Sequence, residues 1–319
     1  MTAYWFGLYA PPDALAGENA VRYRYTYTGL FLLATLALIL GAAAFLLHDV
    51  KCAVLGLAGL EGLTLLGIAV LVIVAIHWEW HERSIEYRLL AELCRKQQVL
   101  ALLGRAVSLG AVRHMETANR AAWVAWLFSA YLRAAPLPCG VMAEALSEIH
   151  GKDVLGEGGL IMEQSHYHKH RYKRASSKGK SRDLWGQRTF IAVCIFVFAK
   201  LAVTGVDWDL GWHSAWGLSF LANWGVSWGS LFGFLAIVLA AISAALVGIR
   251  SYAELPLLAE QSHHMMHELK VAMARVEALH LACPMASQDL GDETYSVAKL
   301  MLRDLEGWGL LFGTKVIEP

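Results

Sequence analysis

The hydrophobic and polar positions divide the chain into four long apolar runs separated by polar stretches. The runs cover residues 28–47, 53–76, 189–206 and 229–249. A helix needs about 20 apolar residues to cross about 30 Å of hydrocarbon, and each run approaches that length. Because only five residues separate the first two runs, they must form a tight antiparallel pair. The pattern predicts an all-α, polytopic membrane protein with two transmembrane helical hairpins.

The polar stretches also predict helices. Residues 83–103 place Ile85, Leu89, Leu93 and Leu100 near one stripe, opposite Arg88, Arg95 and Lys96. This spacing is typical of an amphipathic helix with one solvated face. Two further helices are expected over residues 114–134 and 158–187, the second continuing directly into the third apolar run.

The distribution of Lys and Arg sets the expected orientation. Lys51 is the only Lys or Arg in the first turn, and residues 207–228 contain neither. Positive loops stay in the cytoplasm, so both termini are expected there. The predicted segments are an N-terminal cytoplasmic segment, a first hairpin, a cytoplasmic helical region, a second hairpin and a C-terminal cytoplasmic helical region, over residues 1–27, 28–77, 78–188, 189–249 and 250–319.

Composition supports the membrane assignment. The 319 residues are 57% hydrophobic and 17% charged, with a mean hydropathy of +0.44. The 27 basic and 27 acidic residues cancel, so no global field favours nucleic acid as a partner. The five cysteines are scattered without a CxxC motif and are expected to be reduced thiols. The N-terminus lacks a cationic n-region, so the first run is expected to remain as an anchor.

Two charged residues, Glu61 and Lys200, interrupt the apolar runs. Charges inside a membrane are costly and often functional. By helical rise, Glu61 lies about 12 Å from the outer end of its run and Lys200 roughly 16 Å from the inner end, which places them at similar depth. We expect them to pair or to line a polar lumen in which Glu61 attracts cations. The alternatives are a structural pair that locks the hairpins, or a Lys200 side chain that extends to the boundary.

A basic segment precedes the third run, and Lys169, Arg171, Lys173 and Arg174 are its candidate ligands for lipid headgroups or phosphate. Each basic residue near an anionic surface contributes about 1 kcal/mol. A phosphate or nucleotide ligand is the sharper alternative. The segment also serves as a positive-inside topology signal, and that role alone is sufficient to explain it.

Metal binding and catalysis have little support in the sequence. Three histidine pairs have helical metal-ligand spacing: His77 with His81, His166 with His170, and His263 with His267. Two imidazoles supply only half of a usual site, so no metal is predicted. No GxSxG, HExxH, P-loop or GxGxxG sequence lies in the context that its chemistry requires, so neither an enzyme nor a cofactor is expected.

Short motifs give the sequence a family resemblance. Residues 87–95 read YRLLAELCR directly after a predicted hairpin, with Tyr87, Arg88, Glu92 and Arg95 as its polar and aromatic positions. These residues, together with residues 123–126, 131–134, 164–168 and 240–250, resemble the SLATT group, the SMODS- and SLOG-associating two-transmembrane effectors of bacterial conflict systems.

The resemblance implies a pore-forming or membrane-disrupting effector of antiviral defence in the bacterial inner membrane, which answers a nucleotide signal. No SLOG-type domain precedes the first run, so the sensor would be a separate nucleotide-sensing protein, an omitted segment, or absent. Small residues in the runs permit close helix contacts, and four spans rarely enclose an aqueous path, so a homo-oligomer of at least two copies is expected in contact with membrane lipids. The alternatives are a constitutive ion channel or transporter-like protein, and a non-conducting scaffold.

Overall fold

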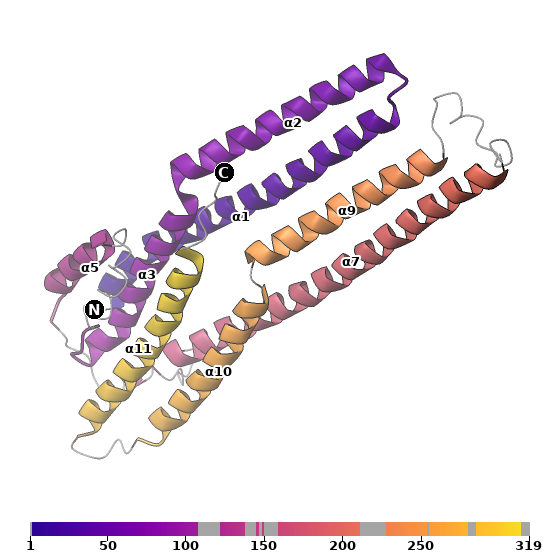
Figure 1. Cartoon of the computed structure of the whole chain (residues 1–319). Coiled ribbons are helices and arrows are strands. Elements are labelled where there is room, and N and C mark those ends of the chain that lie inside the picture. The colour runs from indigo at the N-terminus through magenta and orange to yellow at the C-terminus, as the bar shows by residue number, and fades with distance from the viewer. Residues whose placement is uncertain are drawn as a thin grey trace. The chain divides into compact units, whose positions relative to one another are not determined.

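The structure is a computed structural model that describes residues 2–107, 122–137, 145–146, 149, 159–210, 228–253, 255–279 and 285–313. Over these residues the regular structure is entirely helical, which confirms the predicted all-α class (Figure 1). Four of the helices are long and apolar enough to cross a membrane. They indicate a membrane-embedded protein.

The structure gives the bounds of the following helices. In chain order they are α1 (Thr2–Leu46), α2 (Lys51–Trp78), α3 (Trp80–Leu102), α5 (Ala122–Ala134), α7 (Leu160–Leu210), α9 (Trp228–Ala253), α10 (Leu255–Glu277) and α11 (Ala286–Gly313). Each of the four apolar runs lies in a different helix: α1, α2, α7 and α9. Of the helix predicted over residues 114–134, the structure describes α5; residues 114–121 lie outside the described part.

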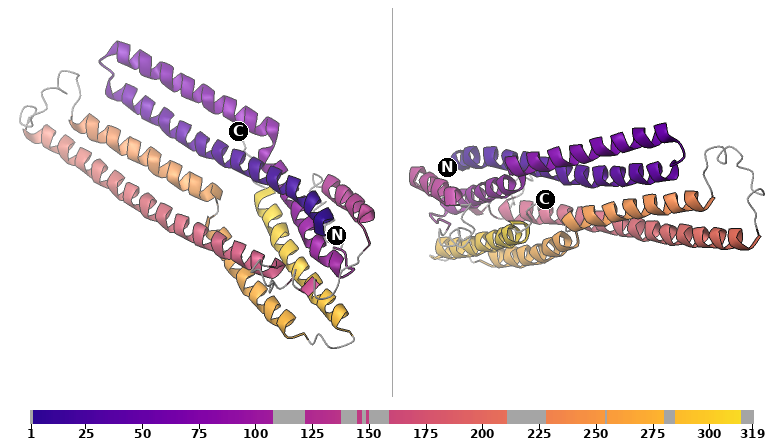
Figure 2. Two further views of the ribbon diagram at one scale, coloured as in Figure 1. Left: turned by 180° about the vertical axis from the view of Figure 1, so that it is seen from behind. Right: turned by 45° about the horizontal axis from the view of Figure 1, so that its top comes forward.

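The helices form two compact units. The apolar unit comprises residues 24–78 and 176–255, and the charged unit comprises residues 1–23, 79–175 and 256–319. In the apolar unit, α1 lies antiparallel to α2, and α7 lies antiparallel to α9 (Figure 2). Gly29 and Gly67 lie at the contact between α1 and α2: a Cβ at Gly29 would lie 3.4 Å from Leu71 of the facing helix, and one at Gly67 would lie 3.9 Å from Leu33, both ordinary van der Waals distances.

The charged unit is built around α3, which packs against α5 and α11. One apolar cluster joins α3 to the first turns of α1, to α5 and to α11, with Trp5, Leu93 and Phe128 fully buried. A second cluster joins α3 to the start of α7, to α10 and to α11 through residues that include Ile161, Leu269 and Leu290. Since both sides of α3 are covered, this helix forms the centre of the unit.

This burial shows that one prediction was wrong. The polar side chains of α3 do not form a solvated face, because Glu92, Lys96 and Gln97 are buried along with the leucines. Apolar residues from α1, α5, α7, α10 and α11 surround the helix on both sides. The charges of α3 therefore need partners inside the protein.

Two long helices cross the boundary between the units. α1 begins at Thr2, well before the apolar run, and contains Pro11 and Pro12. α7 runs without a break from Leu160 to Leu210, which confirms the predicted continuity between the basic segment and the third run. At 1.5 Å per residue both helices are more than twice as long as the hydrocarbon is thick, so only part of each would lie in a membrane.

Candidate functional site

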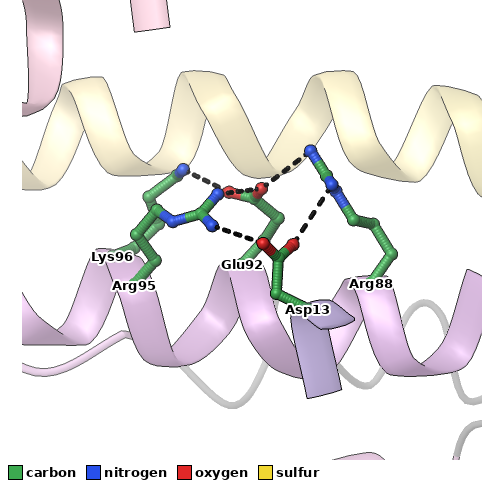
Figure 3. A network of polar contacts seen from close by, with 5 residues as sticks. All are labelled: Asp13, Arg88, Glu92, Arg95 and Lys96. Atoms are coloured by element: carbon green, nitrogen blue, oxygen red, sulfur yellow. Dashed lines mark hydrogen bonds and ion pairs between the residues drawn. The ribbon is translucent and has the colours of Figure 1, made fainter. Parts of the chain in front are cut away.

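Five charged residues of the charged unit form one network of ion pairs, here called the charge cluster: Asp13, Arg88, Glu92, Arg95 and Lys96 (Figure 3). Four of them come from α3, where spacings of three, four and eight residues place side chains on one helical face. Asp13 comes from α1, directly after the two prolines. The cluster therefore joins the first and third helices of the chain.

Glu92 lies at the centre of the charge cluster. Its carboxylate accepts hydrogen bonds from Lys96 Nζ and from Arg95 Nη1, both at 2.6 Å. The Arg88 guanidinium lies 3.3 Å from the same carboxylate. Asp13 bridges the two arginines, with 3.2 Å to Arg88 and 3.3 Å to Arg95. Three cations thus share two carboxylates.

Burial and charge act against each other in this cluster. Burial alone would raise the pKa of Glu92, but the charges of Lys96, Arg95 and Arg88 outweigh it and lower that pKa to about 2. Burial lowers the pKa of the Lys96 ammonium, and the Glu92 carboxylate opposes this effect. Lys96 is only 2% exposed. Loss of its ion pair with Glu92 would therefore leave a buried positive charge uncompensated.

Aromatic rings extend the charge cluster to other helices. The Arg95 guanidinium lies over the Tyr9 ring of α1 at 4.9 Å, and the Arg88 guanidinium lies over the Tyr167 ring of α7 at 5.8 Å. Such cation–π contacts stabilise by about 0.5–2 kcal/mol each, depending on desolvation. The two arginines therefore connect α3 with both helices that continue into the apolar unit.

His168 of α7 is a buried neighbour of the charge cluster, with 3% exposure. Burial, helped by the positive charges of Arg171, Lys96 and Arg88 and opposed by Glu92, lowers its pKa to about 4. Its Nδ1 has no hydrogen-bond partner among the described residues. The imidazole is consequently neutral at neutral pH, beside a group of cations.

The motif that carries the family resemblance has a structural role in this fold. Arg88, Glu92 and Arg95 belong to the charge cluster. Tyr87 instead packs edge-on against Trp123 of α5, with ring centroids 5.8 Å apart. The indole of Trp123 also donates a 2.9 Å hydrogen bond to Glu86. The motif thus places α3 against both α1 and α5.

The predicted basic ligands lie near the start of α7. Lys169, Lys173 and Arg174 are exposed, whereas Arg171 is half-buried with its guanidinium 5.9 Å from the Tyr167 ring. The three exposed side chains are available to an anion, and their role as lipid or phosphate contacts stays a prediction.

Glu61 and Lys200 each lie against a glycine of the antiparallel helix in the apolar unit. A Cβ at Gly41 of α1 would lie 3.1 Å from the Glu61 carboxylate, and a Cβ at Gly233 of α9 would lie 3.2 Å from Lys200 Nζ. Gly41 lies five residues before α1 ends, and Gly233 lies five residues after α9 begins. Glu61 therefore lies near the end of α1, and Lys200 lies at a similar distance from the start of α9. Whether the two side chains pair with each other stays a prediction.

Sequence reasoning missed three contributors to the site. Asp13 was not recognised because its partners lie more than 70 residues away. Lys96 was assigned to a solvated face, although its position four residues after Glu92 is itself an ion-pair signal. His168 was considered only as part of a basic segment and of residues 164–168 in the family resemblance, not as a buried group. Burial distinguishes all three, and burial depends on the tertiary fold.

The histidine pairs do not gather further metal ligands in the described part of the chain, which contains no group of three or more His, Cys, Asp or Glu side chains placed to hold a metal. His81 instead stacks on Tyr23 with centroids 4.4 Å apart, and His263 packs against Tyr172.

Comparison with models of known families, with curated proteins and with solved structures finds no match to this chain. The fold and the site define its class: an all-α, membrane-embedded protein whose charged unit contains a charge cluster centred on the buried Glu92 and Lys96.

Proposed function

We propose that this chain is an oligomeric membrane effector of a bacterial conflict or defence system, which perturbs or permeabilises the inner membrane in response to a cytoplasmic signal. In this proposal the apolar unit crosses the membrane as two helical hairpins, and the charged unit and both termini lie in the cytoplasm. The near absence of Lys and Arg from the two hairpin turns supports this orientation.

One observation carries the proposal: single helices run from the charged unit into the apolar unit. α1 contains both Asp13 of the charge cluster and the Gly41 that contacts Glu61. α7 contains both His168 and Lys200. A change at the cytoplasmic cluster would thus act on helices that reach the intramembrane charges, which is the connection a signal-responsive effector needs.

Assembly would complete the conducting form. On α2, Gly56, Gly59 and Gly62 have no neighbouring atom within 4 Å of an added Cβ, so a second copy could approach this face closely. A dimer is the smallest assembly that we propose. The activating partner would be a separate nucleotide-sensing protein, as the resemblance to the SLATT group implies.

A constitutive channel is the second candidate, favoured by the position of Glu61. A carboxylate held in an apolar helix pair would attract cations to a path without any trigger. This candidate requires conduction that is independent of the charge cluster, and that difference separates the two functions.

The test is membrane potential in bacterial cells that express the full chain at matched membrane levels. The variants are Asp13→Asn, which removes the bridge between α1 and α3, and Glu61→Gln; Glu18→Gln, an exposed ion-pair residue of the same helix, is the control. The effector proposal expects greater depolarisation in Asp13→Asn than in wild type, no change in Glu18→Gln, and loss when Glu61→Gln is added to Asp13→Asn.

Two other results would redirect the proposal. Equal depolarisation in wild type and Asp13→Asn, reduced in Glu61→Gln, would support the constitutive channel. Absence of depolarisation in wild type and Asp13→Asn alike would refute both and leave the non-conducting scaffold.

A further inference from the structure

One face of α7 within the apolar unit is exposed along its length, and its side chains change from cationic to apolar along the chain. Its residues are spaced by three or four positions, which places them on one helical stripe: Lys180, Leu184, Arg188, Ile191, Ile195 and Phe198. The apolar members are 54–68% exposed. This set is called the α7 stripe below.

The opposite side of α7 is the side that packs against α9. The Phe196 ring lies 6.1 Å from the Phe232 ring of α9, and Lys200 lies against Gly233. The α7 stripe therefore points away from this partner helix and is available to a molecule outside the chain.

The stripe has a cationic end and an apolar end. Lys180 and Arg188 are exposed cations about 12 Å apart along the helix. The Arg188 guanidinium lies 5.9 Å from the ring of Trp185, which is 57% exposed beside the stripe. From Arg188 to Phe198 the stripe is apolar for about 15 Å, which is half the thickness of a hydrocarbon core. Its length thus corresponds to one leaflet.

We propose that the α7 stripe binds one anionic phospholipid of the cytoplasmic leaflet. Lys180 and Arg188 contact the headgroup phosphate, Trp185 lies at the level of the glycerol ester, and an acyl chain follows Ile191, Ile195 and Phe198. Charge complementarity selects an anionic lipid, because two cations meet the phosphate and no described acidic side chain belongs to the stripe. The proposal rests on membrane insertion of the apolar unit, as proposed above.

This site differs from the basic residues nearer the start of α7. Lys169 and Lys173 are exposed, but they lie more than four helical turns before the apolar run. They offer charge without an adjoining apolar stripe, so they attract anionic surfaces without holding a single lipid. They supply a control with the same loss of charge on the same helix.

The experiment measures phosphatidylglycerol bound to the purified full chain by native mass spectrometry, titrating the lipid against a phosphatidylcholine background. Lys180→Gln with Arg188→Gln is expected to weaken phosphatidylglycerol binding about thirtyfold, since each basic residue contributes about fivefold. Lys169→Gln with Lys173→Gln is expected to weaken it less than about threefold, because diffuse attraction is screened. Equal weakening in the two double variants would overturn the proposal.

Further arms distinguish a lipid from a free phosphate. Phe198→Ala is expected to weaken phosphatidylglycerol binding a few-fold through lost acyl contact, and added inorganic phosphate is expected not to displace the lipid. Displacement by phosphate, with no effect of Phe198→Ala, would assign the cations to a soluble anion and refute the lipid site. Failure of the wild-type chain to insert into vesicles would instead refute the membrane function, so the two failures are distinguishable.

Discussion

Replacing Glu92 by Gln should destabilise the charged unit strongly, because it removes the central negative charge of the charge cluster with little change in size. Lys96, at 2% exposure, would then face a neutral amide. The pKa of Glu92, about 2 compared with an ordinary 4.5, corresponds to about 3 kcal/mol of stabilisation at neutral pH. Losses of about 3–5 kcal/mol on breaking buried ion pairs agree with this magnitude.

The measurement is thermal unfolding of the full chain in detergent, followed by near-ultraviolet circular dichroism. A loss of about 3 kcal/mol should lower the Tm of a unit of this size by roughly 6–12 °C. Glu18→Gln is the control, because its ion pair with Arg22 is exposed and contributes less than about 1 kcal/mol. Adding Lys96→Met to Glu92→Gln should recover part of the loss, since the buried cation is then gone.

The stability of the charged unit also depends on pH through Glu92. The stabilisation from Glu92 is fully present above pH 4.5 and disappears as the pH falls toward 2. If Glu92→Gln unfolded within about 1 kcal/mol of Glu18→Gln at neutral pH, the charge cluster would not hold the unit together, and this account of it would be refuted.

Three further predictions concern other parts of the chain. The stability of the charged unit should fall by up to about 3 kcal/mol as the pH falls from 6.5 to about 4, because His168 is protonated in the unfolded chain but stays neutral in the folded chain. His168→Leu should remove this pH dependence of thermal unfolding, and an unchanged pH dependence would contradict a buried, neutral His168. In a chain whose other cysteines are serine, the exposed Cys52 should react with an impermeant maleimide from outside spheroplasts, whereas labelling only after lysis would reverse the proposed orientation. Gly41→Val should lower the Tm by the equivalent of about 1–3 kcal/mol through its clash with the Glu61 carboxylate, and Gly17→Val in the same helix, where an added Cβ meets nothing within 4 Å, should not.

The four membrane-length helices could be predicted from sequence because the signal is local. About 20 consecutive apolar residues determine a span without reference to the rest of the chain. The start of α1 could not be predicted in this way: Pro11 and Pro12 argue for a break, and each removes a backbone hydrogen bond. The helix nevertheless begins at Thr2, where tertiary packing buries Trp5 and Ala16 on one side of it.

The site was only partly predictable, for a related reason. The i, i+4 spacing of Arg88, Glu92 and Lys96 is visible in the sequence, and the family resemblance drew attention to two of these residues. Whether such a row of charges faces water or a protein interior depends on helices far along the chain, such as α10 and α11. The contribution of Asp13 depends on the same long-range contacts.

The first two apolar helices differ in mechanical character. α1 is a stiff rod from Asp13 to Leu46, without a proline or a break. In contrast, α2 does not continue directly into α3. Glu79 separates them, and it is the only described non-glycine residue with a positive φ (47°). A non-glycine residue in that conformation costs about 1–2 kcal/mol, so the connection at Glu79 is strained. A displacement of α1 would therefore be carried along one continuous helix, whereas a displacement of α3 would first change the backbone angles at Glu79.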